Sequence, residues 1–232
     1  MRNEAAILNH SLRLAERLQT IIADRDVPVV LGGDCSILVG VGLALRRTGR
    51  FGLISFDGLD YRHPGNSDAV GSAGGESLAL VTGLGGTLAD VDGLRPYVRS
   101  TDVVSIGPRP GDEFADEAAG NGVTVLDAVT VACDPARVAR QAQDVMEDSD
   151  LDGFWVHLDV DVIDAELMPA VDSPEPGGLT FEDLATVLRP LTVSPRFVGL
   201  DVTIYDPDLD PDLRHGQRIA DLLVTALAGA TP

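Results

Sequence analysis

The chain has 232 residues, a length that suits one α/β domain better than two, and hydrophobic residues make up 44% of it. It carries 37 acidic residues against 17 basic ones, for a formal net charge of −20 at pH 7, and every basic residue is an arginine. This charge argues against nucleic-acid binding, because a phosphate backbone is bound through basic side chains. It argues equally against docking on an anionic membrane surface.

Cysteine content and hydropathy indicate the cellular compartment in which the protein is expected. Cys35 and Cys133 are the only cysteines, too few for a disulfide framework. No apolar run reaches the ~18 residues that a membrane span needs. The opening segment, MRNEAAILNHSLRLAERL, is amphipathic and contains acids, which indicates a helix and not a signal peptide. We therefore expect a cytoplasmic protein with a single domain over residues 1–232.

Predicted helices and strands alternate along the chain. Apolar residues recur with a helical period over 2–24, and VPVVLGG (27–33) is a short apolar run typical of a buried strand. Further strands are predicted at 51–58, 102–107, 122–127, 153–162 and 196–203. Further helices are predicted at 36–47, 76–83, 135–147, 180–189 and 213–228. This alternation predicts an α/β fold with three α/β/α layers and a mostly parallel sheet.

Acids and glycines follow several predicted strands, in VVLGGDCS, LISFDGLD, VHLDVDVID and VGLDVTIYD. Ligands of parallel α/β sheets bind at the carboxyl edge, where this topology gathers Asp34, Cys35, Asp57, Asp60, Asp159, Asp161 and Asp201. A single strand-end aspartate is commonly a cap or turn residue. Asp159 and Asp161, with Asp164 after them, lie instead in an apolar run, and the first two share one face of the predicted strand. Charges so close need a cation, or else one acid should titrate unusually high.

Four motifs carry a family resemblance. LGGDCS, SFDGLDYRHP, LDVDVIDAELMPAVDSPEPGGLT and GLDVTIYDPDLDP resemble, in order and over residues 31–211, those of the arginase/agmatinase/formiminoglutamase family, the ureohydrolases. The resemblance implies an arginase-like fold and a binuclear manganese site, whose shared hydroxide attacks a guanidino or amidino carbon. It also implies a homo-oligomer. The chain begins later than family members do, so we expect a smaller sheet with an exposed edge.

The resemblance also implies metal ligands. Asp159 and Asp161 match the acids that bridge both metals, and Asp57 matches the first acid of the Asp-Ala/Gly-His-x-Asp motif. That motif is one residue short here, so Leu59 stands opposite its histidine. The family's other histidine ligand is replaced by a cysteine, whose thiolate is softer than Mn²⁺ prefers. The candidate ligands of one or two Mn²⁺ are Asp57, Asp60, Asp159, Asp161 and Cys35, and Asp60 is also the candidate catalytic residue.

Other histidines leave alternatives open. His63 could swing into the site from its loop or face solvent. His157 lies on the same strand face as Asp159 and could reach the site or be a hydrogen-bonded core residue. His10 and His215 lie on predicted helices and are expected at the surface. The resemblance implies a proton-shuttling histidine at about GSAGGES (71–77), but this segment contains none. The acid that binds the substrate guanidinium in arginase-like members corresponds to a position near Ile204 in this chain.

Two functions follow from this pattern. The first is a metal-dependent hydrolase of a C–N bond in a linear, small guanidino or amidino compound, with a substrate other than arginine. The second is a non-catalytic arginase-fold relative with a degenerate metal site, which acts as a binding or oligomer subunit. The retained DVDVIDAELMPAVDSPEPGGLT motif favours the first, and the residues at positions 35 and 59 favour the second. Metal content discriminates between them.

Overall fold

The computed structural model describes residues 1–148 and 150–229. Within them, six strands form one sheet in the order β1-β6-β5-β2-β3-β4, and every pairing is parallel. The strands are β1 (Val29–Leu31), β2 (Phe51–Phe56), β3 (Val103–Ile106), β4 (Thr124–Leu126), β5 (Gly153–Asp159) and β6 (Phe197–Thr203). The predicted α/β class is confirmed. β1 forms one edge of the sheet, with Val29 and Leu31 exposed.

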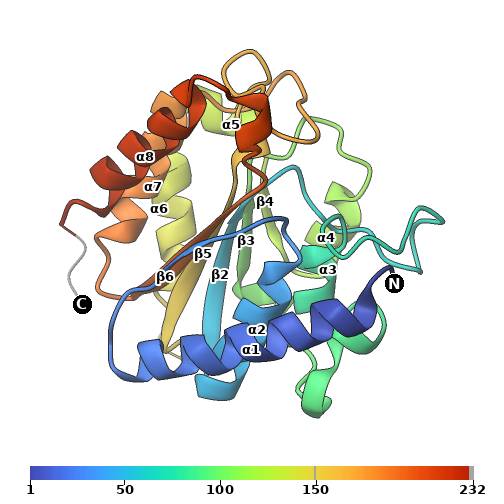
Figure 1. The fold of residues 1–232 in the computed structure, drawn as a ribbon. Coiled ribbons are helices and arrows are strands. Elements are labelled where there is room, and N and C mark those ends of the chain that lie inside the picture. The colour runs from blue at the N-terminus through green and yellow to red at the C-terminus, as the bar shows by residue number, and fades with distance from the viewer. Residues whose placement is uncertain (149, 230–232) are drawn as a thin grey trace.

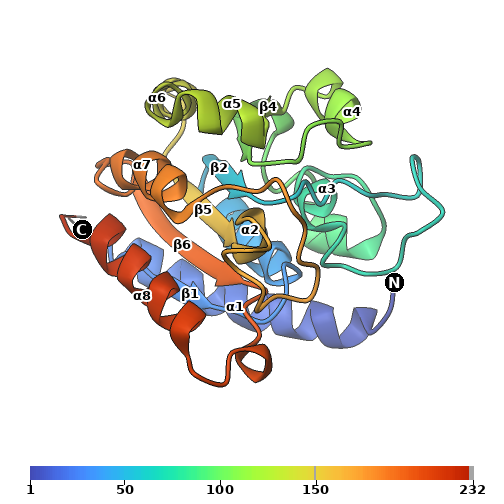
Figure 2. The ribbon, with the colours of Figure 1, turned by 90° about the horizontal axis from the view of Figure 1, so that it is seen from above.

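Helices cover both faces of the sheet, as the three-layer prediction requires (Figures 1 and 2). Side chains from α1 to α4 build the core on one face, and side chains from α5 to α8 build the core on the other. None of these helices is long and apolar enough to cross a membrane. Their bounds are α1 Glu4–Ala23, α2 Ile37–Thr48, α3 Ser77–Val81, α4 Ala115–Gly120, α5 Ala128–Cys133, α6 Pro135–Met146, α7 Phe181–Thr192 and α8 Arg214–Leu227.

Strand β5 runs through the middle of the sheet and is buried along its whole length. Its alternate side chains point to opposite faces of the sheet and pack into different cores. Phe154 and the residues that share its face pack with α5 to α8, whereas Trp155 packs with α1 to α4. Gly199 on β6 makes room for the indole, since a Cβ there would lie 2.4 Å from Cζ3 of Trp155. His157 and Asp159 follow on the Trp155 side, which directs them toward one end of that core.

The end of β5 differs from the prediction. The strand was expected to run to residue 162 but ends at Asp159, and Val160–Val162 form a 3₁₀ turn. The Asp159 carboxylate accepts a hydrogen bond from the Asp161 backbone N–H at 2.9 Å, which turns the chain out of the sheet. The expectation that Asp159 and Asp161 share one strand face is therefore wrong, although both acids reach the carboxyl edge.

Candidate metal centre

A cleft of about 590 Å³ opens at the carboxyl edge of the sheet. Its lining comes from the segments that follow β1, β2, β3, β5 and β6, and it contains nine carboxyl groups against the guanidinium groups of Arg62 and Arg109. All the ligand candidates from the sequence lie in this lining: Cys35, Asp57, Asp60, Asp159 and Asp161. The cleft therefore lies at the strand ends, where the sequence predicts a ligand site.

Four of these candidates form a tight cluster on the cleft floor. Cys35, Asp57, Asp60 and Asp159 each offer one ligand atom, and these atoms lie within 4.8 Å of one another. The Cys35 thiol donates to Asp159 Oδ2 at 2.7 Å, and its Sγ lies 3.2 Å from Thr203 Oγ1. Cys35, Asp57 and Asp159 are buried, with Cys35 1% and Asp57 3% exposed, whereas Asp60 is half-buried. Asp161 lies outside this group, and its Oδ1 is buried without a hydrogen-bond partner.

The protonation of the cluster reflects unneutralised charge. Burial and the neighbouring Asp57 carboxylate raise the pKa of Asp161 from 3.8 to about 7. Burial together with nearby carboxylates also raises the pKa of Asp60 and of Asp159, and raises the pKa of the Cys35 thiol. These shifts have the direction expected of close acids that no cation neutralises. Such a site gains free energy from any positive charge placed in it.

Beneath the cluster lies His157, which is completely buried. The register of β5 and β6 pairs it with Asp201, and its Nδ1 lies 2.5 Å from Asp201 Oδ2. Its Nε2 points to Asp57 Oδ2 at 3.7 Å, beyond hydrogen-bond distance, and neither atom has a hydrogen-bond partner. Burial lowers the pKa of His157, but the Asp201 and Asp57 carboxylates outweigh it and raise this pKa well above its ordinary value.

His157 thus realises both alternatives that the sequence left open. It is a hydrogen-bonded core histidine, and it also reaches the site. Cys35, Asp57 and His157 form a second group of ligand atoms within 4.8 Å of one another. Asp201 was expected at the cleft with the other strand-end acids, and this is wrong: it lies within β6 and is fully buried under the site, where it also accepts a hydrogen bond from Trp155 Nε1 at 2.5 Å.

The remaining histidines take no part in the cluster. The loop residue His63 pairs with Glu117 of α4, with Nε2 2.8 Å from Oε1, so it neither faces solvent freely nor points into the site. His10 is exposed on α1, and His215 is half-buried at the start of α8. Asp164, the last acid of the strand-end series, accepts backbone hydrogen bonds from Glu166 and Gly177 and holds its own loop together.

Arg109 is a residue that the sequence analysis missed. Its guanidinium donates to the carbonyl oxygens of Asp161 and Glu175, both at 2.9 Å, and so ties the turn after β5 to the loop that forms the cleft rim. The signal in the sequence was weak: a lone arginine within the Pro/Gly-rich PRPG segment after a predicted strand. Its contacts are to backbone atoms, which no side-chain pattern encodes.

The donor atoms fit one cation better than the manganese pair that the resemblance implies. Cys35 and Asp57 belong to both groups of ligand atoms, one completed by His157 and the other by Asp60 and Asp159, and each group is compact enough for one ion. Beyond them Asp161 offers a carboxylate, but it joins neither ligand group found among the described residues. Leu59, where the family motif has its imidazole, is 4% exposed and adopts φ 79°, a conformation that is rare for a bulky residue.

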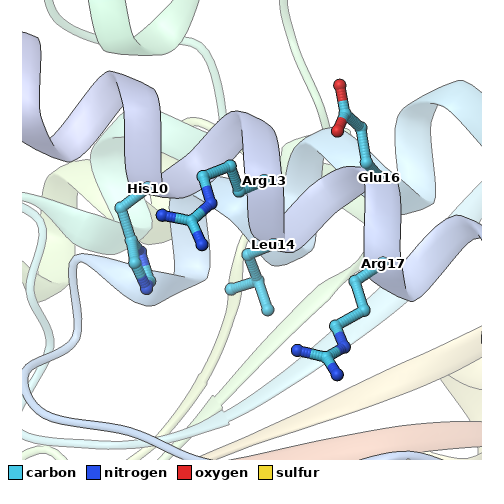
Figure 3. A pocket seen from close by; sticks show the side chains of 5 residues that line it. All are labelled: His10, Arg13, Leu14, Glu16 and Arg17. Carbon is cyan, nitrogen blue, oxygen red and sulfur yellow. The ribbon is translucent and has the colours of Figure 1, made fainter.

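A second hollow, of about 520 Å³, lies along the outer side of α1 (Figure 3). Its lining comes from this one helix: His10, Arg13, Leu14, Glu16 and Arg17. All of these side chains except Leu14 are exposed, and among the described residues no other element contributes to the lining. The hollow therefore lacks the polar groups that several elements bring together in the cleft.

Comparisons with known proteins identify the family to which the chain is similar. The model of the arginase family matches residues 2–229. The chain is 30% identical over 233 residues to an arginase from Agrobacterium fabrum, with 96% of this chain and 70% of the relative covered. It is 25% identical over 222 residues to a formimidoylglutamase from Chromobacterium violaceum, with 93% and 67% covered. The crystal structure of arginase from Bacillus cereus superimposes with a TM-score of 0.90 at 26% identity, over 100% of this chain and 81% of that one.

Proposed function

The chain belongs to the arginase family, and we propose that it is a metal-dependent hydrolase of a guanidino or amidino C–N bond in a small linear compound other than arginine. The observation that carries the proposal is the cluster of Cys35, Asp57, Asp60 and Asp159 on the cleft floor, in which all but the half-buried Asp60 are buried. Buried carboxylates at this density are costly unless a cation neutralises them. A fold kept only for assembly has no need of that cost.

The chemistry of the site divides between a cation and the side chains around it. When bound, a divalent cation lowers the pKa of water and stabilises negative charge that develops on the substrate. Asp60 lines the cleft beside Asp57 and Asp159, and its Oδ2 lies 3.3 Å from the Ser77 hydroxyl. Its raised pKa suits a group that takes a proton from water and returns it to the leaving amine.

Charge in the cleft favours a cationic substrate group. Acids of the rim, among them Asp112, Glu113 and Asp172, add to those on the floor, while Arg109 is engaged by backbone carbonyls. An amidinium or guanidinium is planar and positive, and it is attracted by such a surface. Ile204 lines the same cleft at the position where the resemblance placed an acid for the guanidinium of arginine. This apolar side chain supports a substrate other than arginine.

The test is a hydrolysis screen of the purified, metal-loaded chain. Guanidino and formimidoyl compounds, arginine included, are offered, and the release of urea, ammonia or formamide is measured. Turnover of at least one compound is expected, with arginine a poor substrate, and Asp60→Asn should lower kcat by about 10²- to 10⁴-fold. Asp144→Asn, which removes an exposed charge on α6, should leave kcat unchanged. A folded, metal-loaded chain that turns over none of these compounds would contradict the proposal.

A further inference from the structure

We propose that His157 is itself a ligand of the cation, and that Cys35, Asp57 and His157 bind a single zinc-type ion through one sulfur, one oxygen and one nitrogen. The inference deepens the proposed function, because it identifies the cation of that site. It starts from two buried atoms that lack a hydrogen-bond partner, His157 Nε2 and Asp57 Oδ2. Unpaired buried polar atoms are rare, and a metal ion is one of the few things that explains them.

The distances fit a common coordination sphere. Nε2 and Oδ2 are 3.7 Å apart, and the two groups that contain Cys35 and Asp57 both keep their ligand atoms within 4.8 Å. Two ligands of a tetrahedral zinc, each bound at about 2.0–2.1 Å, lie about 3.4 Å from each other. The pair therefore needs to close by only a few tenths of an ångström to hold an ion.

Asp201 supplies the support that a metal-bound histidine requires. Such a histidine almost always donates its second ring N–H to a carboxylate or carbonyl, which fixes the tautomer and turns the other lone pair toward the metal. His157 Nδ1 lies 2.5 Å from Asp201 Oδ2, and Trp155 Nε1 donates to Asp201 Oδ1 at 2.5 Å. This arrangement leaves Nε2 directed at Asp57. Nε2 therefore faces the Asp57 carboxylate at 3.7 Å with no hydrogen-bond partner of its own.

The chemistry of the donors selects the metal. Thiolate and imidazole suit Zn²⁺, whereas Mn²⁺ prefers carboxylate, carbonyl and water oxygens. Cys35 now donates its thiol proton to Asp159, and a cation would displace that proton, as thiolate ligation requires. Cys35 and Asp57 line the cleft and His157 does not, so an ion held by the three stands on the cleft floor. Three protein ligands and one open position are the pattern of catalytic zinc sites.

The experiment is X-ray absorption spectroscopy of the wild-type chain loaded with Zn²⁺, together with zinc affinity from competition with a chelator dye. The spectrum should show one sulfur at about 2.3 Å and an imidazole nitrogen at about 2.0–2.1 Å. Cys35→Ser should remove the sulfur, whereas Cys133→Ser, at the exposed cysteine of α5, should keep it. His157→Gln should weaken zinc binding by more than about 100-fold and Asp201→Asn by about 10- to 100-fold, while His63→Gln should leave it unchanged.

Two results would overturn the inference: a wild-type spectrum with oxygen ligands alone, or a folded His157→Gln variant that binds zinc as tightly as wild type. The wild-type spectrum decides even where the variant fails to fold. The outcomes also separate this inference from the proposed function. If the zinc site is found as described but no compound is turned over, the proposed function is contradicted and the zinc site stands. If manganese supports turnover and neither sulfur nor imidazole is bound, the zinc site is contradicted and the proposed function stands.

Discussion

His157 and Asp201 face each other across β5 and β6, with Nδ1 2.5 Å from Oδ2, and both side chains are completely buried. The pair lies beneath the cluster of Cys35, Asp57, Asp60 and Asp159, so it links the stability of the sheet to the geometry of the candidate site. Removing one partner of a buried charged pair leaves the other without compensation.

Asp201→Asn should therefore lower the free energy of unfolding by about 3 kcal/mol, because the variant keeps the size of the side chain but loses the charge that faces His157. Urea denaturation at neutral pH measures this change. The matched control is Asp221→Asn on α8, an exposed acid for which the change should stay within about 0.5 kcal/mol. Equal stability of the two variants would show that the His157–Asp201 pair contributes nothing.

The stability of the metal-free chain should fall as pH rises. The pKa of Asp161 is raised to about 7, so the folded state binds this proton more tightly than the unfolded state does. Its contribution is fully present below the ordinary value of 3.8 and is lost as pH rises through about 7. The pKa shifts of Asp60 and Asp159 have the same direction. The melting temperature should therefore be lower at about pH 8 than at about pH 5.

A saturating divalent cation should abolish that decline, because it replaces the protons as the neutralising charge. Thermal melts with and without Zn²⁺ across this pH range check both statements, and Asp161→Asn should flatten the metal-free curve in part. A metal-free chain that melts at the same temperature at both pH values would contradict the electrostatic description of the cleft.

Arg109 should be irreplaceable by lysine. Its planar guanidinium reaches the carbonyl oxygens of Asp161 and Glu175 at once, whereas an ammonium group cannot span both. Arg109→Lys should cost about 1–3 kcal/mol of unfolding free energy, since at least one hydrogen bond from a charged donor to these carbonyl oxygens is lost. The control is Arg140→Lys on the exposed side of α6, where no measurable change is expected. Indistinguishable urea midpoints for the two variants would refute this role.

The acidic residues of the cleft rim should affect the binding of a cationic substrate more than the chemical step. Asp172→Asn should raise KM for a cationic substrate while kcat stays the same, because the residue lies in the cleft lining but outside the ligand cluster. Added salt should raise KM in wild type and less so in the variant. Steady-state kinetics at two ionic strengths measure both effects, with Asp144→Asn as the charge-matched control. A KM that does not respond to salt would rule out electrostatic capture.

Much of the fold could be predicted because the strands of a parallel sheet and the helices that cover it produce long apolar patterns in the sequence. All six described strands and the helices α1, α2, α3, α6, α7 and α8 lie where the pattern of apolar residues placed them. α4 and α5 were not predicted: each has six residues, of which only one in α4 and two in α5 are buried, so neither displays a helical period. The strand over 153–162 was predicted too long because a single hydrogen bond, from Asp161 N–H to Asp159, ends it.

The site could be predicted only in part. Residues at strand ends reach the cleft by topology, so Cys35, Asp57, Asp60, Asp159 and Asp161 were brought together as expected. The place of Asp201 under His157 depends on the register of β5 against β6, which no local pattern determines. Arg109 acts through backbone carbonyls, and its partners become neighbours only in the folded chain.

The most direct test of the account is the metal-to-chain ratio of protein purified without chelator and dialysed against a mixture of Zn²⁺ and Mn²⁺, measured by mass spectrometry of the elements. We expect one ion per chain, and we expect it to be zinc, because one sulfur, one nitrogen and one oxygen donor lie within 4.8 Å of one another at the cleft floor. Two manganese ions per chain, or a folded chain that retains no metal, would contradict it.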